Sequence, residues 1–343
     1  MRPILAVVAA VGMVLASLAI RDRLDRRDEE QSAPLRLTCS LELADACEAL
    51  RVDEPRLTIL VEAAGDTADR LAAATDDTGL DGWLVPEPWP DLVDARRTSR
   101  AMPTLFDRAR KPLARSPLVL VVWKERGAAL SARCGGPVSW KCLGDAAAAG
   151  PWTASGGRAE WGPLKPGYGD PETDGVGLLV LGQAVAGYFG RSDLSTADLD
   201  DDAFARWFGA LGDAVPPSGT SPLDLMLSLG PAAYDATGTT EAQAGPLLAR
   251  SARRASLDLL YPSPMATADV TLATTGTGPS PSLLGRLTAG EVGRRALAGD
   301  GWRVPGEKAI DGVSDSTLPL TTGLPPAGLL DNLRGRWREV TGR

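Results

Sequence analysis

The four cysteines are the residues of this chain that could most directly form a covalent bridge or hold a metal. Cys39 and Cys47 form one local pair, and Cys134 and Cys142 form a second pair with the same spacing. Neither pair has the C-x-x-C spacing typical of zinc sites, and the 343 residues include no histidine. Paired cysteines in a chain with an N-terminal export signal are typical of an oxidising compartment. We therefore expect two disulfides and no metal site.

The two pairs differ in how readily they can be bridged. Gly135-Gly136-Pro137 between Cys134 and Cys142 predicts a turn that brings these two residues together. Cys39 and Cys47 depend on the helix between them. If that helix began at Leu41, its rise of about 9 Å would carry the Cα atoms beyond the bridging limit of about 7 Å. The bridge requires a later helix start, and two buried free thiols are the alternative.

The residue types give little support to a catalytic function. The absence of histidine excludes Ser-His-Asp and Cys-His arrangements and every histidine-ligated metal site. The 44 acidic residues could include a hydrolytic pair, but no spacing singles one out. No phosphate-binding glycine motif occurs, so we expect no cofactor. The net charge of −8 argues against nucleic-acid binding. We therefore expect a protein that is not an enzyme. An extracellular carboxylate-dependent hydrolase is a third hypothesis, less favoured than the two functions named at the end of this section.

The N-terminus carries the localisation signal. Residues 4–20 form an apolar run that would span about 25 Å as a helix, close to the roughly 30 Å of a bilayer core. Small residues at Ser17 and Ala19 leave cleavage open, so residues 1–20 are a signal anchor or a signal peptide. Four arginines follow the run and favour a cytoplasmic body, but the cysteine pairs favour the opposite side. We expect an extracytoplasmic protein, anchored or secreted, with a polar tether over 21–33.

Strands and helices alternate along the rest of the chain, which predicts an α/β fold with a mainly parallel sheet. The length suits two domains. The predicted strands are 35–39, 57–61, 80–85, 117–123, 256–261 and 268–273. The predicted helices are 41–50, 66–74, 138–149, 175–189, 199–211, 240–250, 283–297 and 328–340. The helix over 175–189 is apolar almost all round, which predicts that it is largely buried.

The order of short motifs resembles that of extracellular solute-binding proteins with the type II periplasmic-binding fold, in a bacterial family distantly related to molybdate-binding proteins. The motifs are Leu37-Thr-Cys-Ser-Leu-Glu-Leu43, Asp81-Gly-Trp-Leu-Val-Pro86, Ala114-Arg-Ser-Pro-Leu-Val-Leu120, Gly169-Asp-Pro-Glu-Thr-Asp-Gly-Val-Gly-Leu178, Leu260-Tyr-Pro262 and Gly301-Trp-Arg303. They span residues 35–303. The resemblance implies two lobes joined by crossing segments, with lobe one formed by 34–117 plus 272–343 and lobe two by 118–271.

The resemblance also implies a ligand cleft between the lobes. Open α/β sheets bind ligands beyond the carboxyl ends of their strands and at helix N-termini. The ligand-binding residues implied at matching positions are Ser40, Trp83, Glu87, Ser116, Thr173, Asp174, Gly175 and Tyr261. Among the tryptophans, Trp83, Trp89, Trp152 and Trp161 are candidates for stacking on a cationic solute, with core packing as the alternative.

One position departs from the resemblance. Asp174 stands where oxyanion-binding relatives present bare N–H groups at a helix start, and a carboxylate there occupies these donors and repels an anion. Asp174 as a plain N-cap is the alternative. We therefore expect a small polar solute, with oxyanions disfavoured, that is passed to an ABC permease or a cell-surface sensor. The alternative function is a degenerate binding-fold module that acts as a cell-surface interaction or assembly factor.

Overall fold

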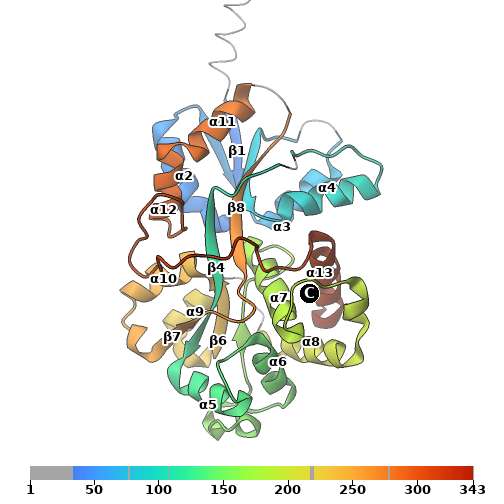
Figure 1. Cartoon of the computed structure of the whole chain (residues 1–343), viewed down its shortest axis with the longest axis vertical. Helices are drawn as coiled ribbons and strands as arrows, with labels where there is room; N and C mark the ends of the chain where they lie inside the picture. The colour runs from blue at the N-terminus through green and yellow to red at the C-terminus, as the bar shows by residue number, and fades with distance from the viewer. Residues whose placement is uncertain (1–33, 76–77, 108, 217–219, 277–278, 343) are drawn as a thin grey trace, which may run out of the picture.

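The computed structural model describes residues 34–75, 78–107, 109–216, 220–276 and 279–342. Two lobes lie one above the other along the long axis, and two long strands join them (Figure 1). The predicted anchor over 4–20 and the tether over 21–33 lie outside the described residues. Within the described ranges, no helix is long and apolar enough to cross a membrane.

Lobe one is built on a sheet in which β1 (Leu35–Cys39) lies between β2 (Leu57–Val61) and β3 (Gly82–Pro86). These three strands are parallel, and β8 (Thr267–Thr274) pairs with β3 in the antiparallel sense. A 3-10 turn, η1 (Leu41–Leu43), leads from β1 into the first helix. The helices of this lobe are α2 (Ala44–Asp53), α3 (Ala64–Ala73), α4 (Trp89–Ser99), α11 (Pro279–Ala289) and α12 (Glu291–Gly299).

Lobe two surrounds the second half of β4 (Ala114–Trp123), which pairs with β6 (Ala236–Thr240) and β7 (Leu257–Leu260). The short β5 (Pro166–Gly167) extends the sheet beside β6. The helices are α5 (Lys124–Cys134), α6 (Trp140–Ala148), α7 (Gly175–Phe189), α8 (Asp202–Ala214), α9 (Pro222–Leu229) and α10 (Glu241–Arg250). The 3-10 turns are η2 (Trp152–Ser155), η3 (Ala159–Trp161), η4 (Thr196–Asp200), η5 (Gly230–Ala232) and η6 (Arg254–Ser256).

Strands β4 and β8 belong to both lobes. Residues 114–117 of β4 pair with β8, and residues 118–123 pair with β6 and β7. From Leu118 to Val122 every residue of β4 is fully buried, as its continuous apolar sequence predicts. The expectation of a mainly parallel sheet is wrong. Because β4 and β8 run between the lobes in opposite directions, each is antiparallel to the strands beside it.

The C-terminal helix α13 (Ala327–Thr341) contacts both lobes. The chain leaves α12, crosses the waist of the molecule and ends in α13 beside α7 and α8 (Figure 1). This helix packs on α4 of lobe one and on α7 and α8 of lobe two. Asp331 pairs with Arg96 of α4 at 2.5 Å, and Arg336 pairs with Asp200 of η4 at 2.8 Å. The assignment of this helix to lobe one stays a prediction.

Both predicted disulfides are confirmed. The Cα atoms of Cys39 and Cys47 are 6.6 Å apart, and those of Cys134 and Cys142 are 5.9 Å apart. The first bridge forms because α2 begins only at Ala44, after η1. The later helix start that the bridge requires is therefore present.

Replacing Cys39 and Cys47 together by alanine should lower the free energy of unfolding by about 2 to 3 kcal/mol. The bridge closes a loop between residues eight positions apart, and the loop-entropy relation gives a cost of this size. Urea unfolding followed by tryptophan fluorescence measures the loss. The Cys134→Ala/Cys142→Ala variant opens a loop of the same length and serves as the matched comparison. A loss below about 1 kcal/mol in both variants would contradict the loop-entropy explanation.

Candidate functional site

The predicted ligand residues of lobe one lie at the ends of β1 and β3. Ser40 and Trp83 are fully buried, and neither Ser40 Oγ nor Trp83 Nε1 has a hydrogen-bond partner among the described residues. The Trp83 ring packs near Phe106, with ring centroids 6.1 Å apart. Glu87 accepts a hydrogen bond of 2.8 Å from Nε of Arg110. These side chains therefore belong to the packing and ion pairs of lobe one.

Asp174 caps helix α7, as its position predicts. Its Oδ1 accepts hydrogen bonds from the backbone N–H groups of Val176 at 2.8 Å and Gly177 at 2.7 Å. Burial raises the pKa of this carboxyl group, although the two backbone donors act in the opposite direction. The first free N–H groups of α7 are thus occupied by the chain's own side chain.

The lobes touch directly at the start of α7. The Nε1 of Trp89 donates to the carbonyl of Gly175 at 2.9 Å, and the N–H of Gly65 donates to the carbonyl of Thr173 at 3.0 Å. Glu42 of lobe one packs so closely on Gly175 that an added Cβ would lie 2.1 Å from its Oε1. Three contacts from lobe one therefore cover the helix start where the resemblance places part of a ligand site.

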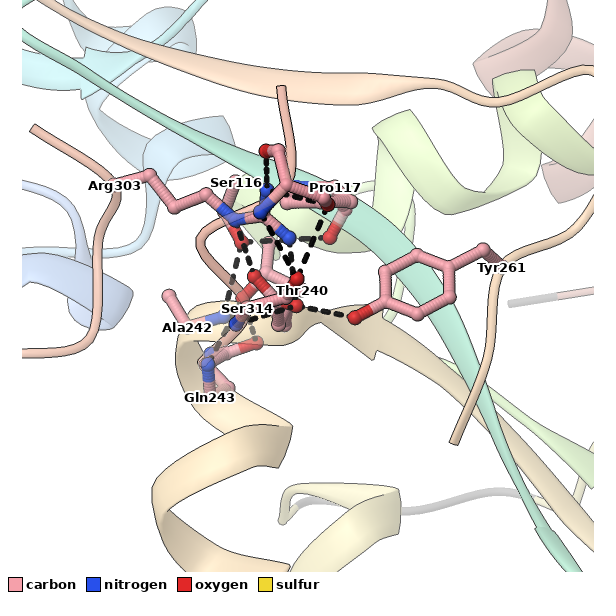
Figure 2. A network of polar contacts seen from close by, with 10 residues as sticks. Ser116, Pro117, Thr240, Ala242, Gln243, Tyr261, Arg303 and Ser314 are labelled. Carbon is pink, nitrogen blue, oxygen red and sulfur yellow. Dashed lines mark hydrogen bonds and ion pairs between the residues drawn. The ribbon is translucent and has the colours of Figure 1, made fainter. Parts of the chain in front are cut away.

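Ser116 and Tyr261 lie at the junction of the lobes, in a polar network around the start of α10 (Figure 2). Ser116 Oγ accepts from the N–H of Ala242 at 2.9 Å. Tyr261 donates its hydroxyl hydrogen to Glu241, and burial together with this carboxylate raises the pKa of Tyr261 to about 12. Arg303 donates to both oxygens of Glu241, at 2.6 and 2.8 Å. The sequence places Glu241 only at the start of the predicted helix over 240–250, and nothing in its spacing indicates an ion pair.

A cavity of about 550 Å³ lies between the lobes, beside this junction. Lobe one contributes Glu42 and Asp45 near the start of α2, and Asp300 at the end of α12. Lobe two contributes the first turn of α9 and residues along the whole of α10, from Ala242 to Arg250. None of the eight predicted ligand-binding residues lines this cavity, so their contact with a solute stays a prediction. Glu42 belongs to a motif that carries the resemblance and follows β1 closely, which is a signal that could have identified it.

The two inner carboxylates of the cavity are poorly compensated. Burial, reinforced by the charge of Asp174, raises the pKa of Glu42 to about 8. Burial and the charge of Asp45 raise the pKa of Asp300 to about 7. Glu42 Oε1 and Asp300 Oδ2 are buried atoms with no hydrogen-bond partner among the described residues. Asp300 lies in an irregular turn after α12, and no sequence pattern indicates its role.

The tryptophans predicted as stacking candidates lie outside the cavity. Trp83, Trp89 and Trp152 are buried in the core, and none of the four candidate tryptophans lines the cavity. The cations over three of them are the chain's own, Arg334 over Trp89 and Arg126 over Trp152 and Trp161. No group of three or more acidic or cysteine side chains is placed to hold a metal in the part of the chain that the structure describes.

Several solved structures of binding proteins superpose on this chain. No family model and no curated protein matches the chain. A periplasmic thiamin binding protein superposes with a TM-score of 0.61 at 13% identity, covering 90% of this chain and 96% of the other. AfuA from Actinobacillus pleuropneumoniae, with bound fructose-6-phosphate, gives 0.59 at 11% identity, covering 90% and 99%. Iron-bound HitA from Pseudomonas aeruginosa gives 0.57 at 13% identity, with the same coverage. The chain therefore has the two-lobed fold of the periplasmic solute-binding proteins.

Proposed function

We propose that this protein captures a small polar solute in the cavity between its lobes and passes it to an ABC permease or a sensor outside the cytoplasm. One observation carries the proposal, a cavity of about 550 Å³ lined by both lobes. This volume lies in the range of small-molecule sites, and such sites commonly form between domains. Two disulfides suit an extracytoplasmic location, where the segment over 4–20 would anchor or export the body.

The proposal is for binding without turnover. The chain has no histidine, and Ser221, the hydroxyl residue among the lining residues, accepts a hydrogen bond from the N–H of Asp224 as the cap of α9. The binding proteins of similar fold have been solved with or named for thiamin, iron and a sugar phosphate. This fold therefore accommodates solutes of different charge, and the ligand class must be argued from the residues of this chain.

A second function is favoured by a different observation. The lobes are tied by the contacts at the start of α7, by the Glu241–Arg303 pair and by α13. Lobes held together in this way suit a module that acts as a surface for assembly at the cell envelope and no longer opens for a solute. In this alternative, no small molecule stabilises the protein.

Thermal unfolding of the full chain in a mild detergent, followed by tryptophan fluorescence, separates the two functions. The panel contains amino acids, amines, sugars and oxyanions. A solute at 100 times its Kd should add about 2.7 kcal/mol to the free energy of unfolding and raise the melting temperature. A concentration-dependent rise with any class supports capture. Unchanged melting with every class would contradict capture and favour the assembly module.

A further inference from the structure

The cavity between the lobes has a strongly unbalanced charge. Five carboxylates face one guanidinium group among its lining residues, which are Glu42, Asp45, Asp224, Asp300 and Asp311 against Arg250. Arg250 is exposed, and its Nε donates to the backbone carbonyl of Pro246 at 3.1 Å. It therefore does not neutralise the inner carboxylates. A field of this sign attracts cations and repels anions.

The inner carboxylates have no cationic partner from the protein. No arginine or lysine forms an ion pair with Glu42 or Asp300 in the described ranges, and each carboxylate leaves one buried oxygen without a hydrogen bond. The groups that face Glu42 from the other lobe do not compensate it, since Asp174 is itself acidic and Gly175 has no side chain. Asp300 faces Asp45. Partly buried carboxylates that have no cationic partner and leave one buried oxygen without a hydrogen bond are unusual, and a bound cation would pair them.

Most of the other lining residues are apolar, and Ser221 and Gln243 are the polar exceptions. Leu223 of α9 is buried, and Leu247 of α10 and Ile310 are partly buried beside it. A bare inorganic cation gains nothing from such side chains, whereas an organic cation can bury its carbon atoms against them. The described carboxylates also lack the three-group geometry that a metal ion needs.

We infer that the solute is an organic cation, with its ammonium group held by Glu42 and Asp300 of lobe one and its apolar part packed on α9 and α10 of lobe two. The inference rests on the proposed function and gives its ligand class. A cation held in this way contacts both lobes, so binding favours the closed arrangement.

Choline, putrescine, glucose and succinate serve as probes, with binding to the full chain measured by isothermal titration calorimetry. At least one of the two cations should bind, and glucose and succinate should bind at least tenfold more weakly. Binding should release protons, because a cation favours the ionised forms of Glu42 and Asp300, whose pKa values are raised to about 8 and about 7. Cation affinity should therefore rise between pH 6 and pH 8, by up to about tenfold per pH unit for one proton released.

Charge-removing variants test the assignment of the anchors. Glu42→Gln and Asp300→Asn should each weaken cation binding tenfold or more and reduce the proton release. Asp224→Asn removes a carboxylate on the lobe-two side of the cavity. It tests the same negative field if a variant of lobe one fails to fold. Glu125→Gln removes an exposed carboxylate outside the cavity and should leave the affinity unchanged.

The outcomes separate the inference from the function on which it rests. Tight binding of glucose or succinate that is unaffected by Glu42→Gln would overturn the cation inference and leave solute capture standing. Cation binding that survives both Glu42→Gln and Asp300→Asn would overturn the assignment of the anchors. Absence of binding by all four probes would overturn the cation inference, and the wider melting panel then decides on capture itself.

Discussion

Replacing Arg303 by methionine should lower the free energy of unfolding by about 3 to 5 kcal/mol. Arg303 donates to both oxygens of Glu241, whose side chain is completely buried, while that of Arg303 is 11% exposed. Without the guanidinium group, the hydrogen bonds that Glu241 keeps among the described residues come from Tyr261 and from the N–H of Ser314 at 3.2 Å. An unpaired buried carboxylate then opposes folding. Urea unfolding at pH 7 measures the loss.

Two further variants show whether the loss comes from the buried charge. Arg295→Met removes the arginine of an exposed pair with Glu291, where both side chains are more than 60% exposed, and should cost at most about 1 kcal/mol. Glu241→Gln combined with Arg303→Met removes the stranded charge and should be more stable than Arg303→Met alone. If the double variant is no more stable, or if Arg303→Met costs no more than Arg295→Met, the buried-pair argument is wrong.

The sequence predicts those strands and helices that have a continuous apolar sequence because they are buried. The apolar run of β4 and the apolar helix α7 are buried, and α7 spans Gly175–Phe189 as expected. The predicted helix over 283–297 is split into α11 and α12 at Gly290, where an added Cβ would lie 2.5 Å from the carbonyl oxygen of Arg286. Such a backbone approach leaves no periodic signal, so the break was not predicted.

The sequence does not predict β6, α4, α5 or α9. Strand β6 has the sequence Ala-Thr-Gly-Thr-Thr and lacks the large apolar residues that mark a buried strand. The reason lies in its neighbours: a Cβ on Gly238 would lie 2.6 Å from both Trp140 and Val180. The small residues are required by the close approach of α6 and α7, which only the tertiary structure shows.

The candidate site also combines a feature that local sequence predicts with features that depend on the tertiary structure. The N-cap role of Asp174 follows from local sequence, and the structure has its two hydrogen bonds. The cavity depends on which helix ends meet across the lobes, and Glu42 and Asp300 are more than 250 positions apart in the chain. Local spacing cannot bring such residues together. The carboxylates that favour a cation are therefore brought together only by the tertiary structure, whereas Asp174, which disfavours an anion, is recognisable in the sequence.

The protein should lose stability as the pH rises from about 5 to about 8. The pKa of Glu42 is about 8 in the folded protein against an ordinary value of 4.5, and that of Asp300 is about 7 against 3.8. Between the two values, the folded protein retains a proton that the unfolded chain has released. The free energy of unfolding then falls with pH, by up to about 1.4 kcal/mol per pH unit for each such proton.

Other carboxyl groups make the free energy of unfolding rise with pH. They do so only at lower pH and do not mask the decline between pH 5 and pH 8. Ion pairs or hydrogen bonds lower the pKa values of Glu48, Glu54, Glu62 and Asp198. Their stabilisation is complete above the ordinary carboxyl pKa and is lost only as the pH falls through the lowered values. We therefore expect maximum stability at mildly acidic pH, near 4 to 5.

Glu42→Gln should flatten this decline, because the amide cannot ionise at the lobe contact. The variant should be similar to the unmodified protein at pH 5 and more stable than it at pH 8, as measured by urea unfolding in a pH series without added solute. Glu125→Gln removes a carboxylate whose side chain is 69% exposed and should leave the decline unchanged. A stability that stays constant or rises from pH 5 to pH 8 would contradict a protonated Glu42 at the lobe contact. An unaltered decline in Glu42→Gln would assign the effect to Asp300 instead. The expected result would show that the free protein holds a proton in the place where we propose that the solute brings its positive charge.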